Sequence, residues 1–179
     1  YCTVLIYYDP FFLSFSQVAS WAEEFLSSGT VEIESTPTIK EVPVLYGGPH
    51  GPDIGFVAEH NGISVEEVVR LHTSQTYLVY VVGFSPGFTA MGTVPQKIQA
   101  PRLPTPRTRV AAGSVGIGGG QTGIYPVESP GGWRLIGRTP LRLFDLNRTP
   151  PSHFQSGDYA RFYSISEEEF LEISKSDIK

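Results

Sequence analysis

Six arginines lie within 41 residues of a chain whose formal net charge at pH 7 is −5. They are Arg102, Arg107, Arg109, Arg134, Arg138 and Arg142. Guanidinium groups bind carboxylates and phosphates through paired hydrogen bonds, and interspersed prolines limit the freedom that binding removes. Two interpretations stay open: an ordinary solvated or ion-paired set, or a convergent set that forms a site for an anionic ligand.

A serine-hydrolase pattern occurs at residues 83–87, Gly-Phe-Ser-Pro-Gly, which fit Gly-x-Ser-x-Gly. A nucleophile at Ser85 would need the backbone N–H of the next residue in its oxyanion hole and a helix that begins at once. The next residue is Pro86, which has no N–H, and no long helix is indicated. We interpret the segment as a rigid turn that presents Phe84 and Phe88.

A glycine-rich segment, residues 118–123, contains Gly-x-Gly-x-x-Gly, the pattern of dinucleotide-binding loops. Such a loop must open a helix that faces the pyrophosphate. Residues 124–133 hold two prolines and two adjacent glycines, so no helix is expected and we reject the fingerprint. Either the amides of Gly119 and Gly120 form an anion-binding nest, or these glycines allow close backbone packing in a β-barrel.

The histidines give little indication of a metal site or a catalytic site. His50, Asp53, His60 and His72 match no recognised spacing of metal ligands, so no metal site is expected. His72 lies near the end of an expected helix. It either interacts with the helix dipole there or serves proton transfer near neutral pH.

Composition limits the classes of function. The acidic balance, with a sequence pI near 5.3, argues against a nucleic-acid-binding surface. No apolar run approaches the roughly 20 residues needed to span a bilayer. Cys2 is the only cysteine, so no internal disulfide forms and the cytoplasm is the expected location. Because residues 1–8 already resemble a buried strand and begin with Tyr1, we infer that an N-terminal stretch is missing.

Residues 1–40 predict part of a small α/β domain. The β-branched and aromatic residues 3–8 predict a strand, and residues 31–33 predict another. Between them, apolar residues at helical spacing from Val18 to Phe25 predict a helix with Ser16 as N-cap and a stop at Gly29.

Residues 41–179 predict a mostly β domain. A strand is expected at residues 42–46, followed by helices at residues 53–60 and 64–73, and a short helix opens at Ser166. In the second helix, a capping box is expected in which Ser64 accepts from the amide of Glu67 and the Glu67 carboxylate reaches back. Between Tyr77 and Tyr163, short apolar runs alternate with glycine and proline pairs, which predicts a β-barrel or sandwich.

The ordered motifs of the chain resemble the family called allophanate hydrolase subunit 1. They are Gly51–Asp53, Leu71–His72, Gly83–Phe88, Pro101–Arg109, Gly113–Val115, Gly119–Pro126, Ser129–Trp133 and Ile136–Pro140. This family also includes the B subunit of the bacterial ATP-dependent 5-oxoprolinase, Kip-type inhibitors of a sporulation histidine kinase, and part of the carboxyltransferase region of urea carboxylase. The resemblance covers essentially the whole chain.

The resemblance implies a cyclophilin-like β-barrel in residues 41–179, preceded by a truncated α/β domain in residues 1–40. It also implies a homologous second barrel subunit as partner, with a third subunit for hydrolysis of 5-oxoproline to glutamate. ATP with Mg is then expected in the assembled complex, and no cofactor in this chain alone. The chain departs from the family at Ala90, where an aromatic is usual, and at Pro95-Gln96, where Asp-Pro is frequent.

Our first hypothesis is a non-autonomous subunit of an ATP-dependent cyclic-amide hydrolase that acts on 5-oxoproline or a similar small carboxylate. The residues assigned to it are Arg107, Arg109 and Arg138 for the carboxylate or phosphate, Gly119, Gly120 and Gln121 for the reacting carbonyl, Tyr125 for the substrate, and Asp53 and His72 for proton transfer.

Two other hypotheses belong to different classes. One is a regulatory protein that inhibits a histidine kinase, with Phe84, Phe88 and Trp133 as partner-binding aromatics. The other is a biotin-dependent carboxyltransferase module of a urea carboxylase or allophanate system.

Overall fold

The computed structural model describes residues 4–29 and 38–176. The chain divides into two compact units, residues 1–36 and 37–179, and each is described by itself. Within the described residues, no helix combines the length and the apolar character that crossing a membrane requires.

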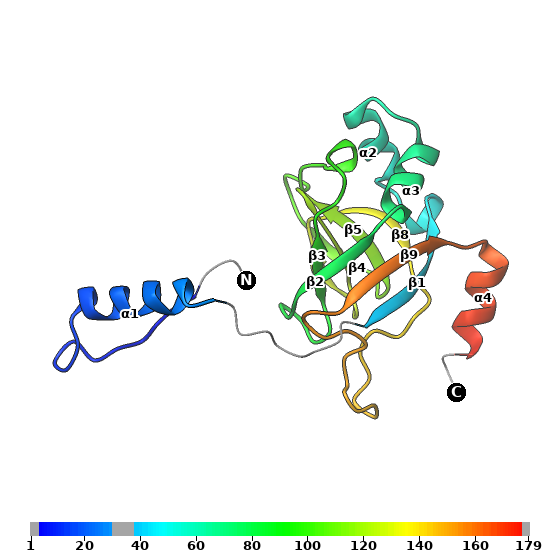
Figure 1. The fold of residues 1–179 in the computed structure, drawn as a ribbon. Coiled ribbons are helices and arrows are strands. Elements are labelled where there is room, and N and C mark those ends of the chain that lie inside the picture. The colour runs from blue at the N-terminus through cyan, green and yellow to red at the C-terminus, as the bar shows by residue number, and fades with distance from the viewer. Residues whose placement is uncertain (1–3, 30–37, 177–179) are drawn as a thin grey trace. The chain divides into compact units, whose positions relative to one another are not determined.

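The elements follow one another as shown in Figure 1. In chain order they are α1 (Phe15–Ser27), β1 (Ile39–Tyr46), η1 (Gly48–His50), α2 (Ile54–Asn61), α3 (Val65–Thr73), β2 (Thr76–Val82), β3 (Thr89–Gly92), η2 (Gln96–Ile98), β4 (Arg107–Val110), β5 (Ser114–Gly118), β6 (Gln121–Ile124), β7 (Ser129–Gly131), β8 (Arg134–Arg138), β9 (Tyr159–Ser164) and α4 (Glu167–Ser176), where η marks a 3-10 helix.

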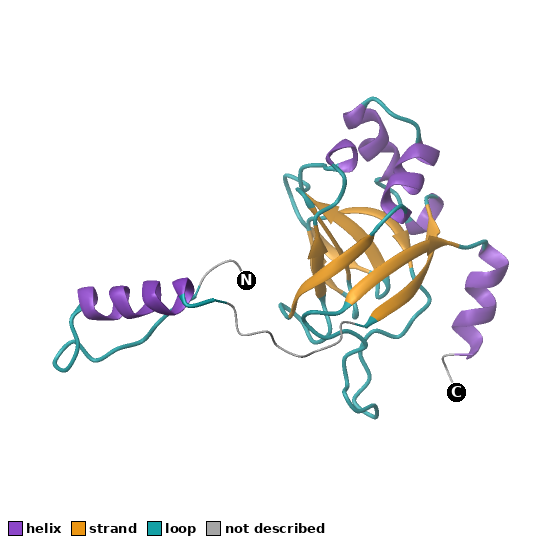
Figure 2. Cartoon of the chain, viewed as in Figure 1, coloured by secondary structure: helices purple, strands orange, loops and turns teal. Residues whose placement is uncertain are grey.

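Seven strands of the second unit form a closed barrel in the order β1, β8, β5, β6, β3, β2, β9 (Figure 2). The barrel closes where β1 pairs with β9 in parallel, while the other neighbouring strands are antiparallel. The remaining strands, β4 and β7, form a two-stranded antiparallel sheet. The expected mostly β barrel is therefore confirmed, and the alternative of a sandwich is wrong.

The interior of the barrel is filled by side chains from nearly every strand and from the helices that cover one end. Its fully buried members include Val42, Val44, Tyr77, Met91, Ile117, Ile124, Ile136 and Phe162. Helices α2 and α3 pack together and add Val57 and Val68 to this core. The core makes the barrel wall rigid, which fixes the backbone positions of the side chains at its rim.

A second apolar layer lies between the barrel wall and the β4–β7 sheet. It consists of Phe88, Ala90, Val110, Tyr125, Trp133 and Leu135. A Cβ added at Gly118 would lie 2.8 Å from the Trp133 ring, and one at Gly123 would lie 2.9 Å from it. Gly118 and Gly123 therefore serve close packing of the indole against the barrel, whereas a Cβ at Gly119 would meet nothing within 4 Å.

Helix boundaries follow local capping chemistry. Ser64 caps α3 by accepting from the Glu67 amide, as expected, but the Glu67 carboxylate binds Arg70 instead of reaching back. For α1 the expected N-cap is wrong: the capping box is made by Ser14 and Gln17. In α3, the guanidinium of Arg70 lies one turn further along the helix and offers two donors to the Glu67 carboxylate. These two donors compete more strongly than the single backbone amide of the capping residue.

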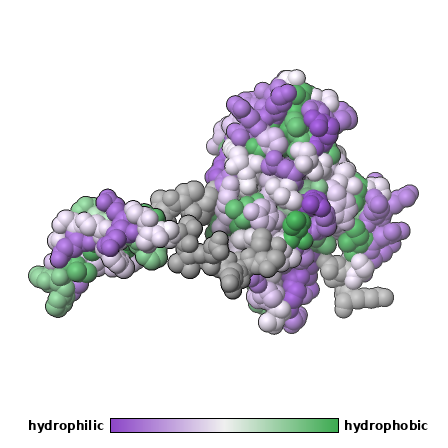
Figure 3. Space-filling view, in the orientation of Figure 1, coloured by the Kyte–Doolittle hydropathy of each residue, from purple (hydrophilic) through white to green (hydrophobic). Residues whose placement is uncertain are grey.

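The N-terminal unit departs from expectation. Residues 4–8 form no strand, although residues 3–8 were expected to, because no described segment pairs with them. The strand expected at residues 31–33 lies outside the described residues. The helix is present, and on its apolar face Val18 is buried, whereas Trp21 and Phe25 are 63% and 61% exposed. Figure 3 shows apolar surface on this unit.

Candidate functional site

Asp53 is the residue that orders one rim of the barrel. It lies just before α2, 7% exposed, and its Oδ2 accepts from the backbone N–H of Leu135 at 2.7 Å. The backbone N–H of Asp53 in turn donates to the Leu135 carbonyl at 2.9 Å. Its Oδ1 accepts from Arg107 Nη2 at 2.8 Å. The carboxylate therefore ties β4 to β8, and both of its oxygens are engaged.

Arg107 is held by that carboxylate through one terminal nitrogen, while the other terminal nitrogen is left without a partner in the described chain. Its Nη1 is buried and has no hydrogen-bond partner among the described residues. A buried donor without an acceptor is rare in folded proteins and costs stability unless a ligand or water supplies the acceptor. The position therefore fits an oxygen of a carboxylate or phosphate.

Three of the expected anion-binding arginines line one cavity of about 240 Å³. Its lining comprises Pro49, His50, Pro52, Arg107, Arg109, Val110, Ala111, Ser114, Leu135 and Arg138. We call it the arginine cavity. Arg109 is largely exposed and pairs with Glu128 at 2.6 Å, whereas Arg138 donates from Nε to the Ala112 carbonyl at 2.7 Å. The β8–β5 register and the β4–β7 sheet bring these side chains together.

His50 was not among the expected site residues for an anion, yet it lines the arginine cavity. It ends η1, and its ring lies 5.1 Å from that of Phe170. The turn that carries it requires glycine at position 51, because an added Cβ would collide with the Ile136 carbonyl. No local sequence pattern signals this position, since it depends on the packing of η1 against β8.

The glycine nest lies away from the arginine cavity. Ser114, at the start of β5, lines the cavity, whereas Gly119 follows the end of that strand, about 16 Å further at the usual rise per residue. The Gly119 N–H donates to the Ala100 carbonyl at 2.8 Å, and Gly120 and Gln121 continue the same hairpin. The structure therefore does not bring the nest and the arginines around one cavity.

Tyr125 belongs to the second apolar layer and not to the cavity. It is 2% exposed, and burial raises the pKa of its hydroxyl. Its backbone N–H donates to the Ser114 carbonyl, and a Cβ at Gly131 would meet its ring. Its observed contacts are those of a packing residue.

His72 is buried inside the barrel with both ring nitrogens engaged. Nδ1 lies 2.7 Å from the Tyr46 hydroxyl and Nε2 lies 2.9 Å from Thr122 Oγ1. Because Thr122 donates to the Gly116 carbonyl, its hydroxyl accepts from Nε2–H, and the Tyr46 hydroxyl donates to Nδ1. Burial lowers the His72 pKa to about 3. A neutral, enclosed imidazole holds the core together and does not exchange protons with a substrate in the arginine cavity, so the structure gives His72 a structural role.

The burial of the His72 imidazole predicts that the folded protein loses stability in acid. The unfolded chain binds a proton at a pKa near 6.5 and the folded state only at about 3, so stability is full above pH 6.5 and falls as the pH drops below it. Between pH 7.5 and 5.0 the free energy of unfolding should fall by about 2 kcal/mol from this group. Urea unfolding of His72→Gln should lack that part of the pH dependence. The exposed His60→Gln variant serves as the control, and an unchanged pH dependence in His72→Gln would refute the assignment.

Substitution of Asp53 is expected to cause a large loss of stability. Asp53→Ala would leave the Arg107 guanidinium and the Leu135 N–H without their acceptors, and breaking a buried ion pair costs about 3 kcal/mol or more. The exposed pair of Glu41 and Arg161 provides the control, since Glu41→Ala should change stability by less than about 1 kcal/mol. If the two substitutions lowered the free energy of unfolding equally in chemical denaturation, the role of Asp53 in linking β4 to β8 would be contradicted.

The three aromatic residues that were expected to bind a partner differ in their exposure to solvent. Phe84 is 86% exposed at the tip of the turn between β2 and β3, where its φ is 71°. Phe88 and Trp133 are each 7% exposed and lie in the second apolar layer. Their own chain covers Phe88 and Trp133, so of the three aromatics Phe84 is the one whose ring is open to a partner.

The described residues hold no group of three or more His, Cys, Asp and Glu side chains that is close enough to bind a metal ion. The turn at Ser85 is closed by hydrogen bonds between Gly83 and Phe88 and between Phe88 and Ser85, and β3 follows it in place of a helix.

Comparison with known proteins gives consistent results. The family described as carboxyltransferase domain, subdomain C and D, matches residues 1–154. The chain is 46% identical over 156 residues to the B subunit of the 5-oxoprolinase of Bacillus subtilis (strain 168), which covers 87% of this chain and 65% of that protein. The chain thus spans less than two thirds of the length of that relative.

Solved structures share the fold. A conserved uncharacterized protein from Pyrococcus horikoshii superposes with a TM-score of 0.72 at 48% identity, over 91% of this chain and 74% of that chain. The urea amidolyase of K. lactis superposes with a TM-score of 0.71 over 95% of this chain and 12% of that chain; at 22% identity this is a likeness of fold alone.

Proposed function

The chain belongs to the family of the carboxyltransferase domain, subdomain C and D, and from this membership we propose that it is a subunit of an ATP-dependent 5-oxoprolinase. Such an enzyme is a hydrolase of a small cyclic amide that carries a carboxylate. The observation that carries the proposal is the arginine cavity, in which Arg107, Arg109 and Arg138 face one small space. The identity to the B subunit of a 5-oxoprolinase supports the same conclusion.

In this proposal the chain binds and orients an anion and does not itself provide a nucleophile. Arg138 and the free Nη1 of Arg107 donate to the carboxylate or phosphate oxygens, and Asp53 fixes Arg107 in position. ATP with Mg, bound in the assembled cytoplasmic complex, supplies the phosphoryl group that activates the amide. The unsatisfied Arg107 donor fits a phosphate oxygen as well as a carboxylate oxygen.

The test is reconstitution of the chain with its neighbouring subunits and measurement of ATP hydrolysis that depends on 5-oxoproline. We expect Arg107→Ala to lower this turnover about 30-fold or more, because a buried charged donor to the ligand is lost. Arg70→Ala is the matched control, since Arg70 forms an exposed pair with Glu67 on α3. No turnover from a folded, complete assembly would refute the proposal and favour a regulatory binding protein.

We further propose that Phe84 contacts the homologous second barrel subunit. A bulky residue at positive φ is strained, and such strain is kept where the surrounding turn holds a side chain for function. Exposed aromatics are frequent anchors of protein interfaces.

Phe84→Ser is expected to weaken association with the second barrel subunit about 30-fold, measured by sedimentation or surface plasmon resonance. Leu171→Ser removes another exposed apolar side chain and should leave association unchanged. Equal affinities for the Phe84 variant and the unmodified chain would remove Phe84 from the interface.

A further inference from the structure

His50 lines the arginine cavity, and the proposed function leaves it without a role. It ends η1, where its backbone N–H donates to the Gly47 carbonyl at 3.1 Å, and its half-buried ring lies 5.1 Å from the ring of Phe170 on α4. Within residues 4–29 and 38–176, its imidazole forms no hydrogen bond and no ion pair. Unlike the enclosed His72, whose two ring nitrogens are both bonded, this imidazole keeps its nitrogens for a ligand.

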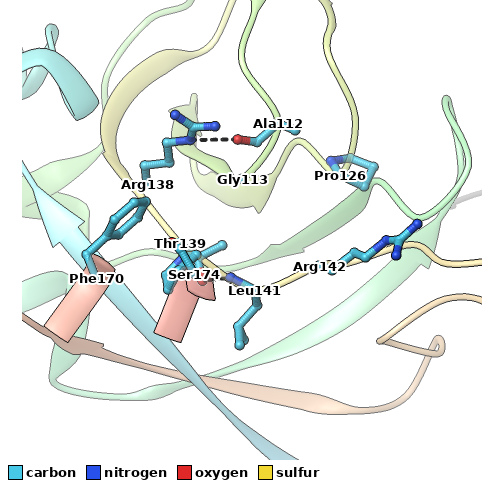
Figure 4. Close-up of a pocket in the computed structure, with 10 residues that line it drawn as sticks. Ala112, Gly113, Pro126, Arg138, Thr139, Leu141, Arg142, Phe170 and Ser174 are labelled. Atoms are coloured by element: carbon cyan, nitrogen blue, oxygen red, sulfur yellow. Dashed lines mark hydrogen bonds between the residues drawn. The ribbon is translucent and has the colours of Figure 1, made fainter. Parts of the chain in front are cut away.

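Two of the three guanidinium groups that line the cavity are already balanced by carboxylates of the chain. The pairs are Arg107 with Asp53, at 2.8 Å, and Arg109 with Glu128, at 2.6 Å. The third group, Arg138, donates from Nε to the Ala112 carbonyl at 2.7 Å (Figure 4). No carboxylate in the described part of the chain forms an ion pair with it. The cavity wall thus carries one positive charge without a counter-charge, which matches a ligand with a single negative charge.

The elements packed around His50 leave no free carboxylate for its ring. Strands β4 and β8 contribute the three arginines, and the segment before α2 contributes Asp53, both of whose oxygens are bonded. Helix α4 contributes the Phe170 ring, while the neighbouring Glu169 accepts from the Ser166 N–H. Since none of the acidic residues that the structure describes pairs with His50, the counter-charge for a protonated imidazole has to come from a ligand.

From these observations we propose that His50 fits the arginine cavity to a doubly charged oxyanion, such as a phosphoryl group, by taking up a proton from solvent when the ligand binds. Histidine is the side chain whose charge changes between pH 5 and 8. Protonation turns the acceptor nitrogen of the ring into a second N–H donor, so that the imidazolium and Arg138 together balance two negative charges. A singly charged carboxylate needs Arg138 alone. This inference rests on the proposed function, since it names the ligand class of the same cavity.

Calorimetric titration of the full chain with sulfate and with acetate tests the inference. Sulfate stays a dianion and acetate a monoanion from pH 6.0 to 8.0, so a proton taken up on binding belongs to the protein. Measured in two buffers of different ionisation enthalpy at pH 7.0, sulfate binding should take up about half a proton and acetate binding about 0.1 proton or less. The affinity for sulfate should fall about ten-fold from pH 6.0 to 8.0, because the imidazolium is lost as the pH rises.

Three variants assign the proton to His50. His50→Gln should abolish both the proton uptake and the pH dependence of sulfate binding. His60→Gln, which changes an exposed histidine on α2 outside the cavity lining, should alter neither. His50→Lys supplies a permanent charge near neutral pH and should bind sulfate at pH 8.0 about as tightly as the unmodified chain does at pH 6.0, without proton uptake.

Sulfate binding without proton uptake in the unmodified chain, or no sulfate binding at all, overturns the inference. Proton uptake that persists in His50→Gln also overturns it, since another group would then carry the proton. None of these measurements involves turnover. The proposed function is decided separately, by whether the complete assembly hydrolyses ATP with 5-oxoproline and whether Arg107→Ala lowers that turnover, so either can fail while the other stands.

Discussion

Arg138→Met is expected to lower the 5-oxoproline-dependent turnover of the assembled complex by about 100-fold or more. The substitution keeps an unbranched apolar side chain but removes the guanidinium, which lines the arginine cavity and also a neighbouring cavity of about 250 Å³. Removal of one partner of a hydrogen-bonded, desolvated charge pair costs about 2–5 kcal/mol, and about 2.7 kcal/mol corresponds to 100-fold.

The control for this variant is Arg70→Met, which breaks an exposed pair on α3 and should leave turnover within two-fold. Stability separates binding from folding: because Arg138 bonds only the Ala112 carbonyl within residues 4–29 and 38–176, its loss should lower the free energy of unfolding by about 1 kcal/mol. Turnover within a few-fold of normal in a stable Arg138→Met complex would contradict the role of Arg138 in binding.

A chain that ends after residue 154 is expected to lose its fold completely. Strand β9 pairs with β1 over six residue positions and with β2 on its other side, so the barrel closes through it. Its loss would uncover the core around the fully buried Ala160 and Phe162 and leave two open sheet edges. The truncated chain should therefore show no cooperative thermal transition and no near-ultraviolet circular dichroism.

A chain that ends after Ser166 tests the same claim from the other direction. It keeps β9 and loses α4, whose described residues include none that is fully buried. Such a chain should keep a cooperative transition, with a lower midpoint. A folded barrel in the chain that ends at residue 154 would mean that β9 is not needed for closure, although the family pattern itself stops there.

Local chemistry made much of the fold predictable. The helices α2 and α3 lie within one or two residues of their expected bounds because Ser64 and the left-handed Gly62 act through neighbouring backbone groups. The β-barrel was predictable because short apolar runs between glycines and prolines suit strands and turns. Pro86 alone was enough to reject the serine-hydrolase pattern, since a missing N–H is a property of one residue.

The parts that were not predictable depend on tertiary packing. The histidine at position 72 is buried because β6 places Thr122 beside it, and no spacing in the helix reveals this. The Gly119 amide donates to the Ala100 carbonyl because the extended segment with Ala100 crosses the end of the β5–β6 hairpin. This amide of the nest is therefore already bonded within the chain. Residues 3–8 carry strand propensity, but a strand also needs a partner, and the described chain offers none to residues 4–8.

The candidate site, like the fold, could be predicted from the sequence only in part. Arginines in a proline-rich context indicated an anion site, but their partners follow from strand register. Arg107 pairs with Asp53 and Arg109 with Glu128, whereas the bond of Arg138 goes to the Ala112 carbonyl. The contribution of α4, whose Phe170 and Ser174 line a second cavity beside Arg138 (Figure 4), had no sequence signal, because an acidic amphipathic helix resembles any surface helix.

Nuclear magnetic resonance of the guanidinium Nε–Hε groups tests most directly whether the arginines share a ligand. Titration of the full chain with 5-oxoproline and with phosphate should shift the signals of Arg107 and Arg138 with one common dissociation constant for each ligand, while the signal of Arg70 stays in place. Signals of Arg107 and Arg138 that do not move, or that move no more than that of Arg70, would contradict a shared anion site in this barrel.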